Sequence, residues 1–221
     1  MLHQLLDTWF HWVEAWGYGG VVFLMALESS IFPVPSEVVI PPAAFWAVNG
    51  RDGAAPTMTL MGVVIAGTIG SYLGSAITYA VSRWVGRPVI ARWGKYVFIT
   101  PEKLARAERF LARYEAGGIF FARLLPVVRH LISIPAGLVR MPFGKFSLMT
   151  TIGSALWCAI LTWYGKGIAE RNPGLIKEPE KLVHAIKHES LWLVAGIAVL
   201  CVLYFLMMRL TGEKHPEGRP E

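Results

Sequence analysis

Residues 27–42, LESSIFPVPSEVVIPP, interrupt a long apolar run with two carboxylates, Glu28 and Glu37, and four prolines. Proline removes a backbone hydrogen bond from a helix, and a charge at the centre of a bilayer costs about 2.5–3.5 kcal/mol. An unbroken membrane helix does not tolerate both. We therefore expect the chain to break here, and we expect opposite charges from another part of the chain to compensate.

The composition places the chain among integral membrane proteins. Hydrophobic residues make up 54% of the 221 residues and charged residues 16%, against about 25% charged in ordinary soluble domains. The net charge of +6 comes from loops between apolar runs, which indicates anionic lipid headgroups rather than nucleic acid. The two cysteines lie in apolar runs and form no disulfide framework.

Three apolar runs, 57–81, 142–165 and 191–210, have the length of about 20 residues that a transmembrane helix needs. Two further apolar regions, 17–48 and 117–141, are cut into fragments of about ten residues. The first is broken at 32–37 and again at Pro41-Pro42, and the second at 123–130 and again at Pro135. A helix of about ten residues rises only about 15 Å. We therefore predict that each of these two regions enters and leaves the membrane on one side, as a re-entrant helical hairpin.

The remaining segments are polar or amphipathic. We predict an interfacial amphipathic helix at 1–16, a basic cytoplasmic loop with an amphipathic helix at 82–116, a polar loop at 166–190 and a disordered tail at 211–221.

The two hairpin regions share their proline spacing. Pro33 and Pro42 are nine residues apart, as are Pro126 and Pro135, and 93 residues separate the pairs. The predicted fold is therefore all-α, with two inverted-topology repeats, each a Pro-broken re-entrant hairpin plus a transmembrane helix, followed by one extra C-terminal transmembrane helix. The predicted hairpin breaks are Pro33, Pro35, Pro126, Pro135 and Gly137.

The loops give an orientation. Residues 82–116 hold eight Lys or Arg against three Glu, which predicts a cytoplasmic loop and, from it, a cytoplasmic C-terminus. The loop at 166–190 then lies outside, although it holds five Lys or Arg beside four Glu.

The second hairpin carries the compensating charges. Arg123 and Arg129 flank Pro126, and His130 follows directly. If the hairpin tips meet, the carboxylates of Glu28 and Glu37 face the guanidinium groups within the membrane. Arginine also binds phosphate through two parallel hydrogen bonds, so this set predicts a site for an anionic headgroup formed by all five side chains.

Burial disfavours the charged form of a carboxyl group, so Glu28 and Glu37 are the candidates for proton coupling. The sequence holds no hydrolase, nucleotide-binding or zinc-site motif. His184 and His188 have helical metal-ligand spacing, but no third ligand accompanies them. We predict no catalytic residue, no metal and no cofactor.

The pattern E-x-x-x-x-P-x-P-S-E at 28–37, followed by F-x-R-x-x-P-x-x-R-H at 121–130 and Ala136-Gly137, resembles the DedA family, also called the SNARE-associated or VTT domain family. The likeness covers about residues 17–165. It implies opposed re-entrant hairpins in a bacterial cytoplasmic membrane and the movement of lipids between leaflets. Family members are tied to undecaprenyl phosphate recycling, phospholipid translocation and the proton motive force.

By this resemblance, the family's essential acidic and basic positions correspond to Glu28, Glu37, Arg123 and Arg129. At His130 the family carries threonine or histidine. The leading hypothesis is a lipid-phosphate flippase that is coupled to protons.

Three alternatives fit the same residues. One is an intramembrane lipid-phosphate phosphatase, for which His130 and Ser133 are the nearest reactive pair. The second is a proton antiporter for small cations, and the third is a membrane organiser that transports nothing. The sequence leaves the lipid, the direction of transport and any homo-oligomer open.

Overall fold

The computed structural model describes residues 13, 15–30, 36–50, 55–93, 111, 117–125, 128–171 and 199, without the side chains at 85–93 and 130. Every regular element in this part of the chain is a helix. Several predicted segments fall almost entirely outside these residues: the helix at 1–16, the polar loop at 166–190, the third span at 191–210 and the tail. Most of the basic loop at 82–116 is outside them as well.

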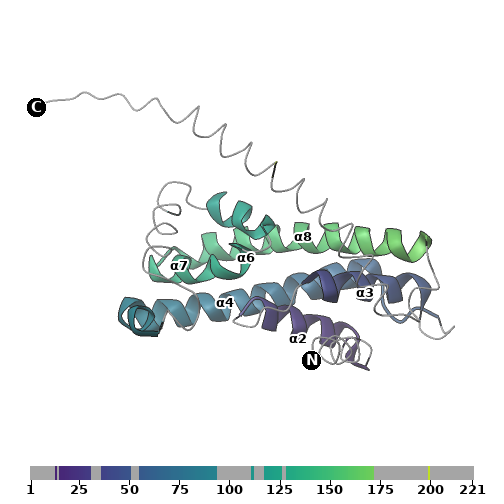
Figure 1. Ribbon diagram of the computed structural model, residues 1–221, viewed down its shortest axis with the longest axis horizontal. Coiled ribbons are helices and arrows are strands. Elements are labelled where there is room, and N and C mark those ends of the chain that lie inside the picture. Colours follow the sequence, from purple (N-terminus) through teal and green to yellow (C-terminus); the bar gives the residue numbers. More distant parts are fainter. Residues whose placement is uncertain are drawn as a thin grey trace, which may run out of the picture.

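The helices are α2 (Tyr18–Glu28), α3 (Ser36–Asn49), α4 (Leu60–Trp93), α6 (Val128–Leu131), α7 (Ser133–Leu138) and α8 (Phe143–Arg171). Residues 117–124 are also helical and form the first limb of the second hairpin region. In Figure 1 the helices α4 and α8 run side by side along the length of the molecule, with α2 and α3 towards one end and α6 and α7 towards the other.

Two of these helices are long and apolar enough to cross a membrane, over Leu60–Trp84 and Phe143–Arg171. They correspond to the predicted spans at 57–81 and 142–165. On α4, large apolar side chains at every fourth position from Met61 to Ile77 are exposed, which is the pattern of a face turned towards lipid. The helix continues to Trp93, beyond the predicted boundary at 81, because a helix does not have to end where its apolar stretch ends.

The second limb of the first hairpin, α3, is one continuous helix that includes Pro41 and Pro42. The predicted second interruption at this pair is therefore wrong. Each proline removes one N–H donor, yet its fixed φ angle is compatible with a helix, so the chain can continue. The backbone of Pro41 also lies against α8, where a Cβ atom at Gly165 would come within 2.7 Å of the Pro41 Cα and carbonyl oxygen.

The second limb of the other hairpin is also nearly continuous. Ile132, between α6 and α7, has helical angles of φ −64° and ψ −25°. Its N–H donates to the carbonyl of Val128 at 3.0 Å, and its own carbonyl accepts from Ala136 at 3.2 Å. Pro135 and Gly137 therefore lie within the helical limb, and the predicted breaks at these two residues are corrected. Pro126, like Pro33 and Pro35, falls outside the described residues, so the breaks at these three prolines stay predictions.

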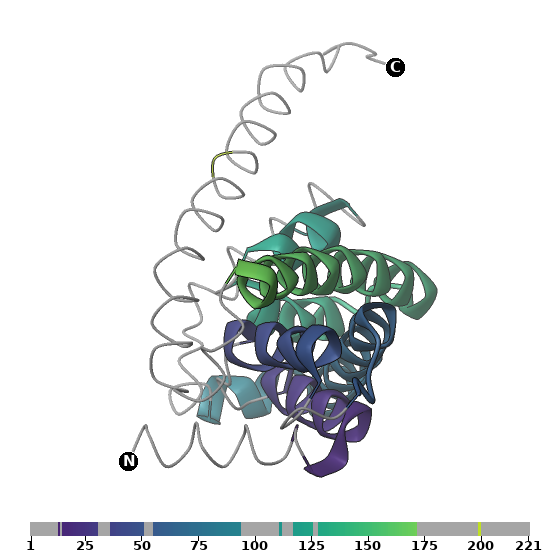
Figure 2. The ribbon, with the colours of Figure 1, turned by 90° about the vertical axis from the view of Figure 1, so that its right-hand side faces the viewer.

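The limbs pack on the spanning helices in a crossed pattern. The first limb of each hairpin lies on the spanning helix of its own half, α2 on α4 and 117–124 on α8. The second limb lies on the spanning helix of the other half, α3 on α8 and α7 on α4. Figure 2, which looks along the molecule, shows α3 between α2 and α8. The two halves are therefore interleaved.

Glycines bring these helices to backbone contact. A Cβ atom at Gly74 of α4 would overlap the carbonyl oxygen of Ala26 in α2, and one at Gly153 of α8 would lie 3.3 Å from the carbonyl oxygen of Phe120. A Cβ atom at Gly137 of α7 would overlap a backbone carbonyl of α4. Small residues of this kind allow close helix packing in membranes.

We predict that Gly74→Ala destabilises the protein by about 1–3 kcal/mol, because the added methyl group meets the backbone of α2 and only a shift of that helix relieves the overlap. Gly167→Ala is the matched control: it is also inside a long helix, and nothing lies within 4 Å of its Cβ position. Thermal unfolding in detergent should give a lower midpoint for Gly74→Ala only. Equal midpoints would contradict the packing.

Candidate functional site

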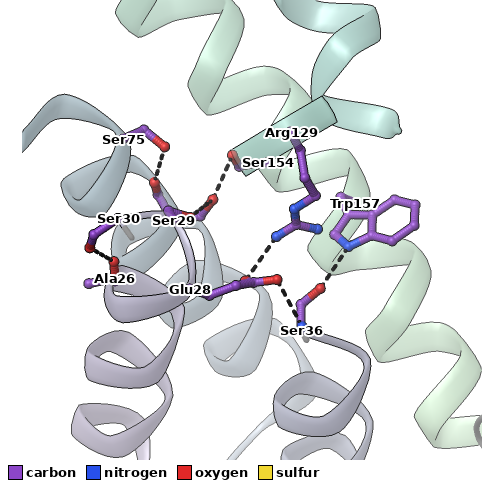
Figure 3. A network of polar contacts seen from close by, with 10 residues as sticks. Ala26, Glu28, Ser29, Ser30, Ser36, Ser75, Arg129, Ser154 and Trp157 are labelled. Carbon is purple, nitrogen blue, oxygen red and sulfur yellow. Dashed lines mark hydrogen bonds and ion pairs between the residues drawn. The ribbon is translucent and has the colours of Figure 1, made fainter. Parts of the chain in front are cut away.

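An ion pair joins the two predicted hairpin regions. Glu28 is the last residue of α2 and Arg129 lies in α6, and the Arg129 Nη2 atom is 3.0 Å from the Glu28 Oε2 atom. Glu28 is 1% exposed and Arg129 is 3% exposed. Figure 3 shows the two side chains pointing towards each other from different helices. The predicted meeting of an acidic and a basic hairpin is therefore present for this pair.

The start of α3 completes the acidic side. The backbone N–H of Ser36 donates to the Glu28 Oε1 atom at 2.8 Å. The first N–H groups of a helix have no partner within the helix, and the helix N-terminus attracts negative charge. Glu28 therefore caps the helix that follows its own, and this contact holds both ends of the first hairpin turn together.

Trp157 of α8 supports both partners of the ion pair. Its indole N–H donates to the Ser36 hydroxyl at 3.1 Å, and the Arg129 guanidinium carbon lies 5.3 Å from its ring centroid. This distance is within the range of a cation–π interaction. The four side chains of Glu28, Arg129, Trp157 and Ser36 thus form a closed circuit of contacts (Figure 3).

The second arginine is held differently. Arg123 is 2% exposed, and its Nη2 atom donates to the Ser133 hydroxyl at 2.9 Å. A Cβ atom at Gly153 would come within 2.7 Å of the Arg123 Cβ atom, so the glycine allows the arginine backbone to approach α8. Within the described residues, no carboxylate forms an ion pair with Arg123.

Two guanidinium nitrogens in this region have no hydrogen-bond partner in the described part of the protein. They are Nε of Arg123 and Nη1 of Arg129, and both are buried. A buried donor to which no acceptor is supplied costs about 1–3 kcal/mol, and more when it is charged. Two buried cations therefore face one buried carboxylate, and the donors that are left over are suited to a further anion.

A chain of serine hydroxyls adjoins the ion pair. Ser71 of α4 is hydrogen bonded to Ser29 and to Ser154, with an oxygen–oxygen distance of 3.1 Å in each case. Ser29 is the neighbour of Glu28 in the sequence, and Ser154 lies one turn before Trp157 on α8. All three serines are buried, and Figure 3 shows Ser29 and Ser154 beside Glu28 and Arg129.

The other predicted site residues, Glu37 and His130, are not part of the Glu28–Arg129 ion pair. Glu37 is half-buried in the first turn of α3, close enough for its charge to act on Glu28. It is not a partner in the Glu28–Arg129 ion pair, so the expected face-to-face arrangement of two carboxylates and two arginines is present only in part. The side chain of His130 lies outside the described residues.

Sequence reasoning missed Trp157 and gave Ser36 no role in the site, and it named Ser133 only as the reactive partner of His130 in the phosphatase alternative. A signal for Trp157 was available: it lies near the middle of the predicted span 142–165, whereas interfacial tryptophans lie near the ends of spans. Ser36 and Ser133 gave no such signal, because serine is common where membrane helices pack.

The side chains of the described region offer no metal centre. No group of three or more His, Cys, Asp or Glu is placed there to hold a metal ion. Cys158 is buried with a free thiol. The arrangement is a buried cluster of two arginines and one carboxylate.

Comparisons with known proteins identify the relatives of this chain. The sequence profile of the VTT domain matches residues 34–167. The membrane protein YkoX of Bacillus subtilis is 33% identical over 218 residues, 98% of this chain and 90% of its own length. Undecaprenyl phosphate transporter A of the same species is 34% identical over 162 residues, 73% of this chain and 77% of its own.

An alkaline phosphatase-like protein of Lactococcus lactis is 35% identical over 205 residues, 89% of this chain and 90% of its own length. No solved structure matches the chain.

We predict strong coupling between Glu28 and Arg129 in a double-mutant cycle. Each of Glu28→Gln and Arg129→Gln leaves an uncompensated buried charge and should lower the unfolding free energy by about 3–5 kcal/mol. The double variant should lose much less than the sum, as measured by unfolding in mixed detergent micelles.

The control for this cycle is the exposed pair of Lys166 and Glu170, whose charged atoms are 3.5 Å apart. Its coupling should stay below about 0.5 kcal/mol. If the effects of Glu28→Gln and Arg129→Gln are additive, the two side chains do not interact in the folded protein.

Proposed function

The chain belongs to the VTT domain family, also called the DedA family, and on this basis we propose that it moves an anionic, phosphate-bearing lipid between the leaflets of a bacterial membrane. Undecaprenyl phosphate is the leading candidate, because two relatives, from Bacillus subtilis and Staphylococcus aureus, are named undecaprenyl phosphate transporter A. A phospholipid is the other lipid of this chemistry.

One observation carries the proposal: the unfilled donors of two buried arginines. Arg123 Nε and Arg129 Nη1 point into the interior without an acceptor among the described residues. The two guanidinium groups are close enough for their charges to repel each other. A phosphate group relieves both conditions, because it offers several acceptor oxygens and negative charge to more than one arginine. A lipid can present such a group while its tail stays in the hydrocarbon.

We propose that the crossed packing reflects two inverted repeats with re-entrant hairpins that enter from opposite sides. Three features support this: limbs of only 11 residues in α2 and 14 in α3, tips that meet at Glu28 and Arg129, and equivalent glycine contacts in both halves. The basic residues of 82–116 support a cytoplasmic position for that loop. A midplane site between two opposed hairpins can be reached from each leaflet in turn.

Proton coupling follows from competition for Arg129. A phosphate that takes the donors of Arg129 removes the ion-pair partner of Glu28. Burial of a lone carboxylate is unfavourable, so Glu28 then takes up a proton. Glu37, half-buried nearby, is the second candidate for the proton. In this mechanism the lipid phosphate replaces the Glu28 carboxylate as the anion beside Arg129. Because Glu28 is neutral once it is protonated, the net buried charge stays nearly constant.

We predict that proteoliposomes with the wild-type protein exchange labelled undecaprenyl phosphate between leaflets, and that Arg123→Ala and Arg129→Ala each slow this exchange about tenfold or more. The loss of a hydrogen bond to a charged group is worth about 1.5–3 kcal/mol. Arg171→Ala, which removes an exposed arginine at the end of α8, should exchange lipid at the wild-type rate. No exchange by the wild type, or full exchange by both site variants, would contradict the proposal.

The same vesicles distinguish transport from phosphatase activity. The relatives named alkaline phosphatase-like proteins make phosphatase activity the second candidate function. Ser133, whose hydroxyl accepts a hydrogen bond from Arg123, is the hydroxyl that would act as nucleophile. Transport leaves the lipid phosphate intact. Release of inorganic phosphate by the purified protein, abolished in Ser133→Ala, would favour the enzyme instead.

We predict that Glu28→Gln removes the stimulation of lipid exchange by a proton gradient, because glutamine still accepts the Ser36 N–H but cannot take up a proton. Glu37→Gln tests the second carboxyl in the same way, and Glu170→Gln, on the exposed end of α8, serves as the control. A full response to the gradient in both Glu28→Gln and Glu37→Gln would remove these two groups from the coupling.

A further inference from the structure

The interfaces between helices are of two kinds. Backbone contacts at glycine join α2 and α7 to α4, at Gly74 and Gly137, and join 117–124 and α3 to α8, at Gly153 and Gly165. Such contacts leave no room for one helix to move on the other. We call α2, α4 and α7 the first body, and the helical segment 117–124, α3 and α8 the second body. The Glu28–Arg129 ion pair and Trp157 lie where the bodies meet.

The spanning helices of the two bodies contact each other partly through apolar side chains, with Tyr79 stacked on Phe146 and Gly67 against Cys158, and between these contacts through hydroxyl groups. Ser71 of α4 is bonded to Ser154 of α8, and Tyr72 of α4 to Ser147 of α8, both at 3.1 Å. The first contact is buried, whereas Tyr72 and Ser147 are half-buried at the edge of the bundle. We call these four residues the α4–α8 seam. A hydroxyl bond can be exchanged for one to water or phosphate at small net cost.

One hydroxyl along the seam lacks a partner. Thr150 lies on α8 between Ser147 and Ser154, is 0% exposed, and its Oγ1 atom has no hydrogen-bond partner among the described residues. Thr151, the next residue along α8, is exposed in the middle of an otherwise apolar outer face. Hydroxyls therefore extend from the lipid-facing surface to the interior, which apolar packing of two spanning helices does not require.

The seam leads to the charged site. Its inner member Ser71 is bonded to Ser29, the neighbour of Glu28. Its other inner member Ser154 precedes Trp157, against which Arg129 lies, by one turn. A headgroup between α4 and α8 would therefore meet hydroxyl donors along its path, followed by the unfilled donors of the arginines.

The other junction between the bodies is closed by apolar side chains. Where α2, α3 and α4 meet, the buried residues include Leu24, Val39, Ile40 and Val63. A phosphate that crossed this junction would lose its hydration without gaining hydrogen bonds, which is strongly unfavourable. The α4–α8 seam is the more suitable route of the two.

We propose that the α4–α8 seam is the lateral entrance through which the phosphate of the lipid reaches Arg123 and Arg129, and that it opens when the two bodies separate. This inference rests on the proposed function and adds to it the surface that the lipid headgroup crosses. The tail remains in the bilayer outside Tyr72 and Ser147, while the headgroup exchanges water for the seam hydroxyls.

Two disulfides test the proposal. Ser71→Cys with Ser154→Cys links α4 to α8 across the seam, and Asn49→Cys with Ala169→Cys links α3 to α8 within the second body, away from the charged site. The native contacts are similar in length, 3.1 Å between the two serine oxygens and 3.2 Å between the Asn49 amide nitrogen and the Ala169 carbonyl oxygen. The background replaces Cys158 and Cys201 by alanine, and mass spectrometry confirms each disulfide.

Each variant is compared with itself before and after oxidation, so effects of the substitutions cancel. We expect oxidation of the seam pair to lower exchange of labelled undecaprenyl phosphate at least about tenfold, with recovery in reductant, because the bodies can no longer separate. Oxidation of the α3–α8 pair should change the rate less than about twofold. Recovery in reductant shows that the variant is folded.

The outcomes are distinguishable. Exchange that continues through the oxidised seam pair would overturn the entrance while leaving the proposed transport in place. Equal inhibition by both disulfides would overturn the division into two bodies. Absence of exchange by the wild-type protein would refute the proposed function itself, and with it the entrance.

Discussion

The ion pair between Glu28 and Arg129 is the interaction on which the rest of the structure depends. It joins the tips of two hairpins that come from separate halves of the chain, and it is almost fully buried. A buried ion pair contributes little net stability, whereas removal of one partner is costly. Apolar packing could join the tips as well, so the retention of charge points to a ligand rather than to stability.

The residues around this ion pair hold it in place but leave some of the arginine hydrogen-bond donors without an acceptor. Ser36 and Trp157 fix the carboxylate and the guanidinium, and Gly153 brings Arg123 close to the spanning helix. Even so, one nitrogen of each arginine has no partner in the described part of the chain. A site held firmly with donors left over is preorganised for an acceptor from outside.

Much of this arrangement could be predicted from the sequence, because its main signals are local. Charge inside an apolar run is expensive, so Glu28 and Arg129 required each other, and length and composition were enough to identify the spans in α4 and α8. The break expected at Pro126 lies outside the described residues and stays a prediction.

Other features depend on tertiary contacts that a single sequence does not show. Pro41 and Pro42 remain within a helix, because proline fits helical φ angles and the backbone of Pro41 packs against Gly165. Pro135 removes one hydrogen bond without turning the chain. Trp157 matters through its contacts with Ser36 and Arg129, which come from two other helices. The pairing of α3 with α8 and of α7 with α4 is likewise a property of the assembled halves.

The most direct test of the central claim is an electron cryomicroscopy map of the protein in nanodiscs with undecaprenyl phosphate. We predict phosphate density between Arg123 and Arg129, with the Glu28 carboxylate moved away from Arg129. Phosphate density only at exposed cations such as Arg140 and Lys145, with the Glu28–Arg129 contact intact, would contradict the account.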